Sequence, residues 1–128
     1  MKAYHVTEQG NYQNIKNNGF IKTRGTFGEG VYFYDDCSKA KQRGEEVNNQ
    51  FSQSNLVVFK VELSEGDYKF LNSQEEYAKF CEKYNCSPGN YVSWNSSDLF
   101  NKGIKGIVFK TEYIDEIVVY DLDTIVIL

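Results

Sequence analysis

The fold is indicated most clearly by the stretch Leu56-Val57-Val58-Phe59-Lys60-Val61-Glu62-Leu63. Its first half is continuously apolar and its second half alternates apolar with charged residues, which predicts a strand. Further short strands are expected at residues 2–7, 31–34, 68–71, 106–110, 114–120 and 124–128. Because several strands follow one another without a helix between them, the sequence predicts an α+β fold with a largely antiparallel sheet.

Helices are expected between some of these strands. Asn11 and Gly19 bracket a short helix as N-cap and left-handed end, and residues 36–49 read as an exposed helix. Ser73 opens a helix that reaches Tyr84, with Glu76 completing a capping box. A further short helix begins at Ser96 or Ser97 and ends at Gly103. Residues 23–30 are expected to form a loop because they carry three glycines, and residues 47–55 a flexible one.

Length and composition bound the class of protein. The 128 residues, 41% of them hydrophobic and 16% aromatic, predict one domain over residues 1–128 and exclude a disordered chain. No apolar run is long enough to cross a bilayer, and the N-terminus has no signal-peptide core. We therefore expect a cytoplasmic monomer without a membrane partner.

Charge is unevenly distributed along the chain. The net charge is −4, which disfavours binding of nucleic acid through its phosphate backbone. Residues 1–60 carry eight Lys or Arg against six Asp or Glu, so this half has enough positive charge to bind a small anionic ligand. Three cysteines and a single histidine make a metal site unexpected, and the thiols are expected to be reduced.

Three local patterns contain residues that can carry chemistry. The first is His5-Val6-Thr7 in the opening strand. The second is Gly28-Glu29-Gly30-Val31-Tyr32-Phe33, followed by Asp35 and by Ser38-Lys39-Ala40. The third is Asp115-Glu116-Ile117-Val118-Val119-Tyr120-Asp121. Each alone has a purely structural explanation, but their order and spacing over one short chain favour a shared site.

In these patterns the chain resembles the ADP-ribosyltransferases of the His-Tyr-Glu type, the group that contains the poly-ADP-ribose polymerases and diphtheria toxin. The matching residues are His5 with Thr7, Tyr32 in the glycine-led strand with Ser38-Lys39 after it, and Glu116 before Ile117-Val118-Val119-Tyr120-Asp121. The segment Ile15 to Phe20 also resembles the family. The resemblance implies two small packed sheets, a split β-sandwich, with three or four short helices and a cleft for NAD.

The resemblance also implies roles for single residues. His5 would hydrogen-bond the adenosine ribose, with Thr7 supporting that end, and the main chain of Val6 would pair with the nicotinamide carboxamide. Tyr32 would stack on the nicotinamide ring. Glu116 would bind the nicotinamide ribose and stabilise the positive charge that forms when nicotinamide leaves. His5, Tyr32 and Glu116 are therefore the candidate catalytic residues, and no metal is required.

Other positions match the family less closely. The resemblance implies that Arg24, Gly30 and Ser38 also contact NAD, with Lys22 and Arg24 near the diphosphate. Val6 stands where the family has Gly, Ala40 where it has a second Ser, and Arg43 where it has a second ring-stacking Tyr. Tyr34, Tyr91 or Trp94 are the candidates for a replacement wall of the nicotinamide site.

The resemblance implies a glycosyltransferase that uses NAD as co-substrate for mono-ADP-ribosylation, with a protein as the favoured acceptor. A small-molecule acceptor remains open, while the basic pattern of the RNA 2′-phosphotransferase branch is absent from the sequence. One alternative is an NAD glycohydrolase with water as acceptor. Another, of a different class, is a catalytically weak NAD-binding or protein-interaction module. Glu116 favours the two enzymatic alternatives, because a module that only binds NAD needs no carboxylate beside the ribose.

Overall fold

A computed structural model of the chain describes residues 1–48 and 55–128. Within them lie eight strands and four α-helices. The strands are β1 (Lys2–Glu8), β2 (Thr23–Gly25), β3 (Gly28–Tyr34), β4 (Leu56–Leu63), β5 (Tyr68–Leu71), β6 (Gly106–Phe109), β7 (Glu116–Val119) and β8 (Ile125–Ile127). The α-helices are α1 (Tyr12–Asn18), α2 (Cys37–Asn48), α3 (Gln74–Tyr84) and α4 (Ser96–Asn101). Single 3-10 turns occupy Gln9–Asn11, Tyr91–Ser93 and Leu122–Thr124.

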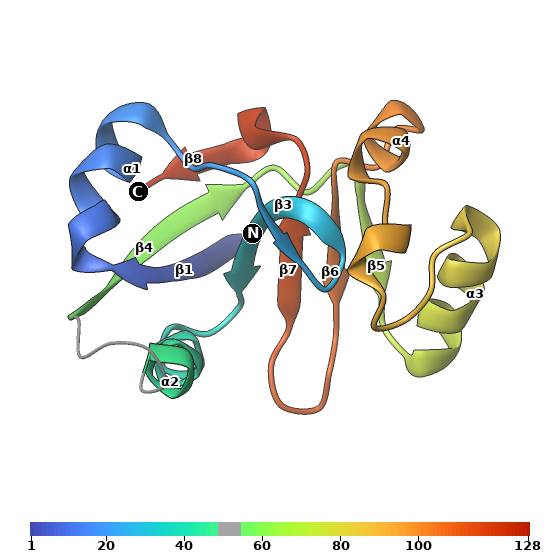
Figure 1. The fold of residues 1–128 in the computed structure, drawn as a ribbon, viewed down its shortest axis with the longest axis horizontal. Coiled ribbons are helices and arrows are strands. Elements are labelled where there is room, and N and C mark those ends of the chain that lie inside the picture. The colour runs from blue at the N-terminus through green and yellow to red at the C-terminus, as the bar shows by residue number, and fades with distance from the viewer. Residues whose placement is uncertain (49–54) are drawn as a thin grey trace.

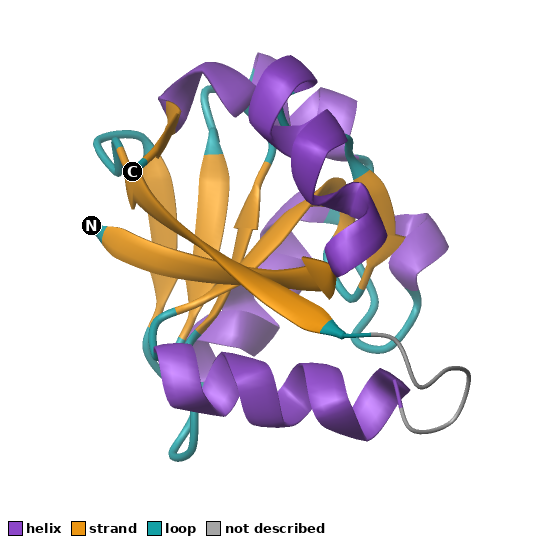
Figure 2. Ribbon diagram, turned by 90° about the vertical axis from the view of Figure 1, so that its left-hand side faces the viewer, coloured by secondary structure: helices purple, strands orange, loops and turns teal. Residues whose placement is uncertain are grey.

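The strands form one curled sheet with the order β5-β6-β7-β3-β1-β4-β8, and β2 pairs with β3 outside this path. All pairings are antiparallel except that of β5 with β6. Figure 1 shows α1 beside the β1-β4-β8 half and α3 beside the half that contains β5. Figure 2 shows α2 lying across one side of the sheet. The predicted α+β class with a largely antiparallel sheet is confirmed.

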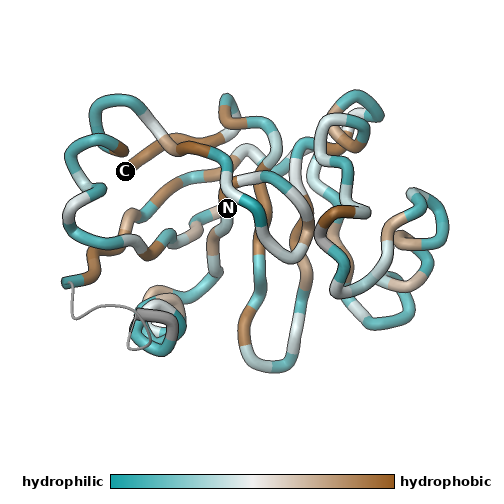
Figure 3. Tube along the Cα trace, in the orientation of Figure 1, coloured by the Kyte–Doolittle hydropathy of each residue, from teal (hydrophilic) through white to brown (hydrophobic). Residues whose placement is uncertain are grey.

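The sheet buries side chains on both faces because β7 and Tyr120, which follows it, contribute alternate residues to two cores. Val118 and Tyr120 belong to the core under α3 and α4, whereas Ile117 and Val119 belong to the core under the β1-β4-β8 half. All four are at most 1% exposed. Figure 3 shows apolar residues along the strands, while α1 and α2 are largely hydrophilic.

The helix ends follow local sequence signals. Gly19 ends α1 as expected and has a positive φ of 82°, but its ψ of −178° lies outside the left-handed helical region that the sequence predicted. Asn11 makes no side-chain cap, because its backbone is already helical as the last residue of the 3-10 turn; its amide donates to Thr7 Oγ1. Ser73 Oγ accepts from the Glu76 N–H, which confirms the N-cap of α3. The helix α4 is capped by Asn95, whose Oδ1 accepts from the Asp98 N–H, one residue before the expected position.

The expected loop over residues 23–30 is wrong in most of its length. These residues form the β2–β3 hairpin, in which Thr23 pairs with Gly30 and Gly25 with Gly28. The glycines serve close approach rather than flexibility: a Cβ atom on Gly30 would lie 2.5 Å from Val118 Cγ2. The flexible loop expected at 47–55 lies mostly outside the described residues.

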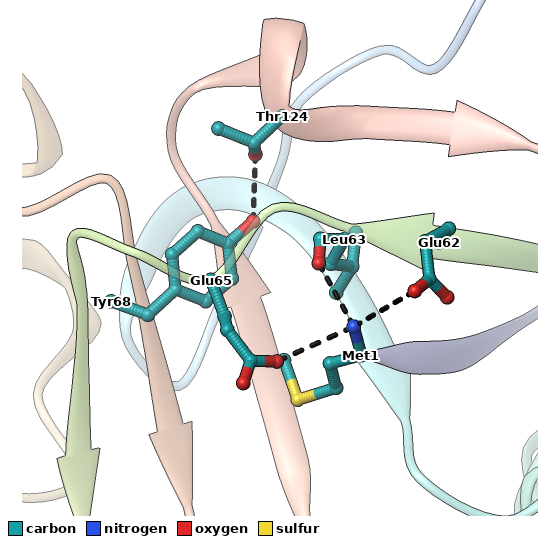
Figure 4. Close-up of polar contacts among 6 residues, drawn as sticks. All are labelled: Met1, Glu62, Leu63, Glu65, Tyr68 and Thr124. Carbon is teal, nitrogen blue, oxygen red and sulfur yellow. Dashed lines mark hydrogen bonds and ion pairs between the residues drawn. The ribbon is translucent and has the colours of Figure 1, made fainter.

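Polar contacts join the start of β1 to the end of β4 (Figure 4). The Met1 ammonium lies 3.2 Å from Glu62 Oε1 and donates to the Leu63 carbonyl at 3.1 Å.

Nearby, the buried Thr124 hydroxyl donates to the Asp121 carbonyl, so the Tyr68 hydroxyl is the donor in its 2.7 Å bond to Thr124. Burial raises the pKa of Tyr68 to about 12, with the Thr124 bond opposing that rise, so this phenol stays protonated at neutral pH.

Replacement of Thr124 by Val is expected to lower the free energy of unfolding by about 1–3 kcal/mol, because the buried Tyr68 hydroxyl loses its acceptor. Urea unfolding of Thr124→Val measures this loss. The exposed Thr23 provides the matched control, and Thr23→Val should change stability by less than about 0.5 kcal/mol. Equal stabilities of the two variants would show that the Tyr68–Thr124 bond contributes nothing.

None of the described helices is long and apolar enough to span a membrane.

Cys37 is exposed, while Cys81 and Cys86 are buried near each other at the end of α3, and all three thiols are free. Burial raises the pKa of Cys86 to about 11, so this thiol is protonated and unreactive at neutral pH.

Candidate active site

The first residue of β7, Glu116, lies on the same face of the sheet as two tyrosines of β3. Glu116 is paired with Tyr34, and Val118 with Tyr32. Because paired residues share a face and alternate residues repeat it, Glu116, Tyr34 and Tyr32 point to the same side. All three are half-buried. The register therefore brings together the carboxylate of the third sequence pattern and the phenol of the second.

Arg43 of α2 adds a positive charge to this face. Burial raises the pKa of Glu116 above its ordinary value, and the nearby Arg43 charge opposes that rise. Burial and the charge of Glu116 likewise raise the pKa of Tyr34, again opposed by Arg43. We define these residues, Glu116, Tyr32, Tyr34 and Arg43, as the Glu116 cluster. A half-buried carboxylate beside a cation and two phenols can bind hydroxyl groups and stabilise positive charge.

The segment before β7 is fastened to α2, which sets the distance between Glu116 and Arg43. The Tyr113 hydroxyl donates to Gln42 Oε1 at 2.7 Å, and the Lys39 ammonium donates to the Tyr113 carbonyl. The Asp115 N–H donates to Asp35 Oδ1 at 2.9 Å. These contacts join residues about 75 positions apart in the sequence and hold the helix against the start of β7.

Tyr32 is engaged by the β2–β3 hairpin. Its hydroxyl donates to the Gly28 carbonyl at 2.6 Å and accepts from the Phe27 N–H at 3.0 Å. Its ring covers Gly25, where a Cβ atom would lie 2.4 Å from Tyr32 Cζ. Burial raises the pKa of Tyr32 well above its ordinary value, although the Phe27 bond opposes this. One function of this ring is therefore to close the hairpin, which the sequence did not reveal.

His5 lies on the opposite face of the sheet from Tyr32. Its imidazole packs edge-on against Phe20 and Phe33, with ring centroids 5.0 and 5.6 Å away. His5 Nδ1 lies 2.7 Å from the Tyr32 carbonyl oxygen. Because a carbonyl only accepts, Nδ1 carries the proton. Burial lowers the pKa of His5, with the Tyr32 bond opposing, so the ring is neutral at pH 7 and Nε2 is a free acceptor.

The contact of His5 with Tyr32 marks the place where β1 and β3 separate. The ladder between these strands contains one pair, Tyr4 with Tyr34, whereas β1 forms seven pairs with β4. The main chain of Val6 therefore lies beyond the β1–β3 ladder on that side. The Val6 side chain packs under α2, where a Cβ on Gly44 would lie 2.5 Å from Val6 Cγ1.

The remaining expected contacts for NAD lie at several places. Thr7 Oγ1 accepts from Asn11 Nδ2, and Ser38 Oγ donates to Asp36 Oδ1 in the first turn of α2. Arg24 is exposed on β2 and lies 3.6 Å from Glu29. Gly30 is buried against β7. The structure brings Tyr32 and Glu116 together, but it does not gather Thr7, Arg24 and Ser38 around them.

Among the candidates for a second aromatic wall, Tyr34 belongs to the Glu116 cluster. Trp94 is 3% exposed and stacks in the core with Phe80, at 5.7 Å between ring centroids. Trp94 is therefore mainly a core residue, although it also lines a pocket beside β2, and its role as a wall of the nicotinamide site stays a prediction. The side chain of Tyr91 lies outside the described part of the structure. Ala40 is fully buried, so this position serves packing of α2.

Two adjoining pockets lie along β2 and α4. One of about 240 Å³ is lined by Arg24, Gly28 and Trp94, and one of about 390 Å³ by Lys22, Phe100 and Asp121; both include Ser97. A third, of about 230 Å³, lies between β5 and α3. His5, Tyr32 and Glu116 line none of these three pockets. Within residues 1–48 and 55–128, no three His, Cys, Asp or Glu side chains are grouped so as to hold a metal ion.

A comparison of the chain with protein-family models and with curated protein sequences finds no match. The geometry of the described residues is therefore the basis on which a function is proposed.

Proposed function

We propose that the chain is an NAD-dependent mono-ADP-ribosyltransferase of the His-Tyr-Glu type. The observation that carries the proposal is the Glu116 cluster, in which a half-buried carboxylate shares one face of the sheet with two tyrosines and feels the charge of Arg43. Burying a carboxylate costs stability unless its partners or its function compensate. A carboxylate held ready beside a developing positive charge is such a function.

The proposed reaction breaks the bond between the nicotinamide nitrogen and the ribose C1′. The bonding electron pair leaves with the ring, so neutral nicotinamide departs and positive charge develops on the ribose, as in glycoside hydrolysis. The Glu116 carboxylate stabilises this charge. The acceptor nucleophile then forms the new bond to C1′, and Glu116 takes the proton that the acceptor loses.

The features of β1 and β2 fit the rest of NAD. The His5 Nε2 atom can accept a hydrogen bond from a ribose hydroxyl, because Nδ1 is committed to Tyr32. The Val6 main chain beyond the β1–β3 ladder can pair with the carboxamide. Lys22 and Arg24, both exposed beside the two adjoining pockets, supply positive charge for the diphosphate.

The single Tyr4–Tyr34 pair also supports the finer fold proposal, a sheet split between β1 and β3 into two packed parts. Since His5 and Glu116 lie on opposite faces, NAD would pass from one face to the other through the region where β1 and β3 are unpaired. The adenosine end would then lie near His5 and the nicotinamide ribose near Glu116.

Ionisation of Glu116 is expected to set the lowest pH at which the chain is active, and Arg43 is expected to shift that pH. Glu116 must be ionised, so activity is lost as pH falls through its pKa, which burial raises above the ordinary value of 4.5. Because Arg43 lowers that pKa, Arg43→Gln should move the acid limb of the kcat profile to higher pH. Nicotinamide release measured from pH 4 to pH 8 tests this. Lys41→Gln on the same helix is the control and should leave the pH profile unchanged. If the acid limb of the profile stays at the same pH in Arg43→Gln, Arg43 does not influence the pKa of Glu116.

The experiment that tests the proposed function uses NAD labelled in its adenylate half, incubated with the purified chain and a cell lysate. Label that becomes attached to protein and resists nuclease treatment supports a transferase with a protein acceptor. If the label appears only in free ADP-ribose, the chain is a glycohydrolase and not a transferase. Unaltered NAD would overturn both activities and leave an NAD-binding or interaction module.

A further inference from the structure

A groove with a positive rim lies between β5 and α3, on residues that the proposed function does not use. Its volume is about 230 Å³. Phe70, Phe80 and Tyr84 form its apolar floor together with Leu71, and three lysines, Lys69, Lys79 and Lys83, line it with one carboxylate, Glu76. We call this set of eight residues the lysine groove.

The concentration of positive charge in the lysine groove runs against the charge of its surroundings. Residues 61–128 contain six Lys or Arg against twelve Asp or Glu, yet three of those six cations line this one groove. The acidic residues nearby are largely engaged: Glu75 pairs with Lys79 at 3.1 Å, and Glu76 accepts from the Asn72 N–H. An exposed ion pair such as that with Glu75 is weak and easily exchanged for another carboxylate.

The edge of the sheet forms one side of the groove. The strand β5 stands at the end of the strand order and pairs with β6 through Lys69–Ile107 and Phe70–Val108. Within the described residues, no strand pairs with the other edge of β5. The Tyr68 N–H is bonded to the Glu65 carbonyl and the Asn72 N–H to the Glu76 carboxylate, which leaves the main-chain groups of Phe70 on this edge as the ones to which an extended segment can bond.

The size of the groove selects among possible occupants. Sites for cofactors and drug-sized ligands measure about 300–1,000 Å³, so a groove of about 230 Å³ fits one or two side chains better than a whole ligand. Nucleic acid is disfavoured because three lysines in an acidic half of the chain supply little of the charge that a phosphate backbone requires.

We propose that the lysine groove binds an extended, acidic peptide segment of a partner protein. The segment aligns with the free edge of β5, its apolar side chains enter the floor between Phe70, Phe80 and Tyr84, and its carboxylates pair with the lysines. This is the mode in which main-chain bonds supply affinity and alternate side chains supply specificity. The proposal goes beyond the proposed function and stands whether or not Glu116 acts on NAD.

The test uses a short fluorescent peptide of alternating glutamate and leucine residues, with binding followed by anisotropy. The wild-type chain should bind it with a dissociation constant of about 10–100 μM, in the range of weak transient contacts. The double variant Lys79→Glu/Lys83→Glu should bind at least about tenfold more weakly. The matched control, Lys16→Glu/Lys60→Glu, makes the same change of net charge at exposed sites elsewhere and should stay within about twofold of wild type.

Each alternative has its own result. Equal loss of binding in both double variants would show that net charge alone attracts the peptide, and this would contradict the lysine groove as its binding site. Unchanged peptide binding by Lys79→Glu/Lys83→Glu would also contradict the proposed binding site. Tighter binding of a labelled single-stranded RNA than of the peptide would show that the surface binds nucleic acid instead. Backbone amide shifts on titration with the peptide should concentrate in β5 and α3, and shifts confined to other elements would contradict the proposal. The four lysines substituted are exposed, so melting curves should remain close to wild type.

Discussion

Replacement of Glu116 by Gln should lower the rate of nicotinamide release from NAD by at least about 100-fold. The amide keeps the size of the side chain but can neither stabilise the developing positive charge nor take a proton from the acceptor. The dissociation constant for NAD should change far less, because the lost interaction forms mainly in the transition state. Chromatographic measurement of released nicotinamide, together with NAD titration by calorimetry, separates the two effects.

The same substitution is expected to stabilise the fold. Burial raises the pKa of Glu116 in the folded chain, so the folded state binds more protons than the unfolded state, and the free energy of unfolding falls as pH rises through this pKa. At pH 8, Glu116→Gln should therefore melt about 2–4 °C higher than wild type. The difference should narrow as pH falls toward 4.5. The exposed Glu112 gives the control: Glu112→Gln should change neither melting nor rate, and a Glu116→Gln variant that retains full activity would remove Glu116 from the mechanism.

Replacement of Tyr32 by Ala should weaken NAD binding more than replacement of His5 by Gln. The Ala variant loses the ring proposed to stack on nicotinamide, whereas glutamine retains a polar group able to reach a ribose hydroxyl and the Tyr32 carbonyl. We expect a loss of at least about tenfold in affinity for Tyr32→Ala and a smaller loss for His5→Gln. Equal dissociation constants for the two variants would contradict the assignment of stacking to Tyr32.

The contacts of Tyr32 with the hairpin require a variant that separates binding from folding. Tyr32→Ala also loses two hydrogen bonds and the packing on Gly25, so its free energy of unfolding should fall by about 2–4 kcal/mol. Tyr32→Phe keeps the ring, and it should lose about 1 kcal/mol while binding NAD nearly as well as wild type. If Phe weakens NAD binding as much as Ala does, the hydroxyl and its hairpin matter to the ligand and the ring does not.

Much of the fold could be predicted from sequence because its signals are local. The strands at Leu56–Leu63 and Tyr68–Leu71 and the Ser73 cap of α3 lie where periodicity and side-chain chemistry put them. The β2–β3 hairpin was missed because glycines that usually mark loops here permit close packing, as at Gly30 against Val118. Such contacts depend on a strand 88 positions later and leave no local signal.

The candidate site was predictable only in part. The sequence patterns singled out Tyr32 and Glu116, but their common face depends on the register of β3 against β7. The pairing of strands about 80 residues apart cannot be read from either strand alone. For the same reason the sequence showed neither that His5 faces Phe20 and Phe33 nor that the charge of Arg43 acts on Glu116. Arg43 appeared only as the loss of an aromatic residue, whereas the structure shows a cation that lowers the pKa of Glu116.

The most direct measurement follows purified wild-type chain with NAD by proton NMR. The proposed chemistry predicts that signals of free nicotinamide grow as those of NAD decline, with a matching rise of ADP-ribose or its adduct. It also predicts that this conversion stops in Glu116→Gln. NAD that persists unchanged with folded wild-type chain and an added lysate, or nicotinamide release that continues undiminished in Glu116→Gln, would contradict the account.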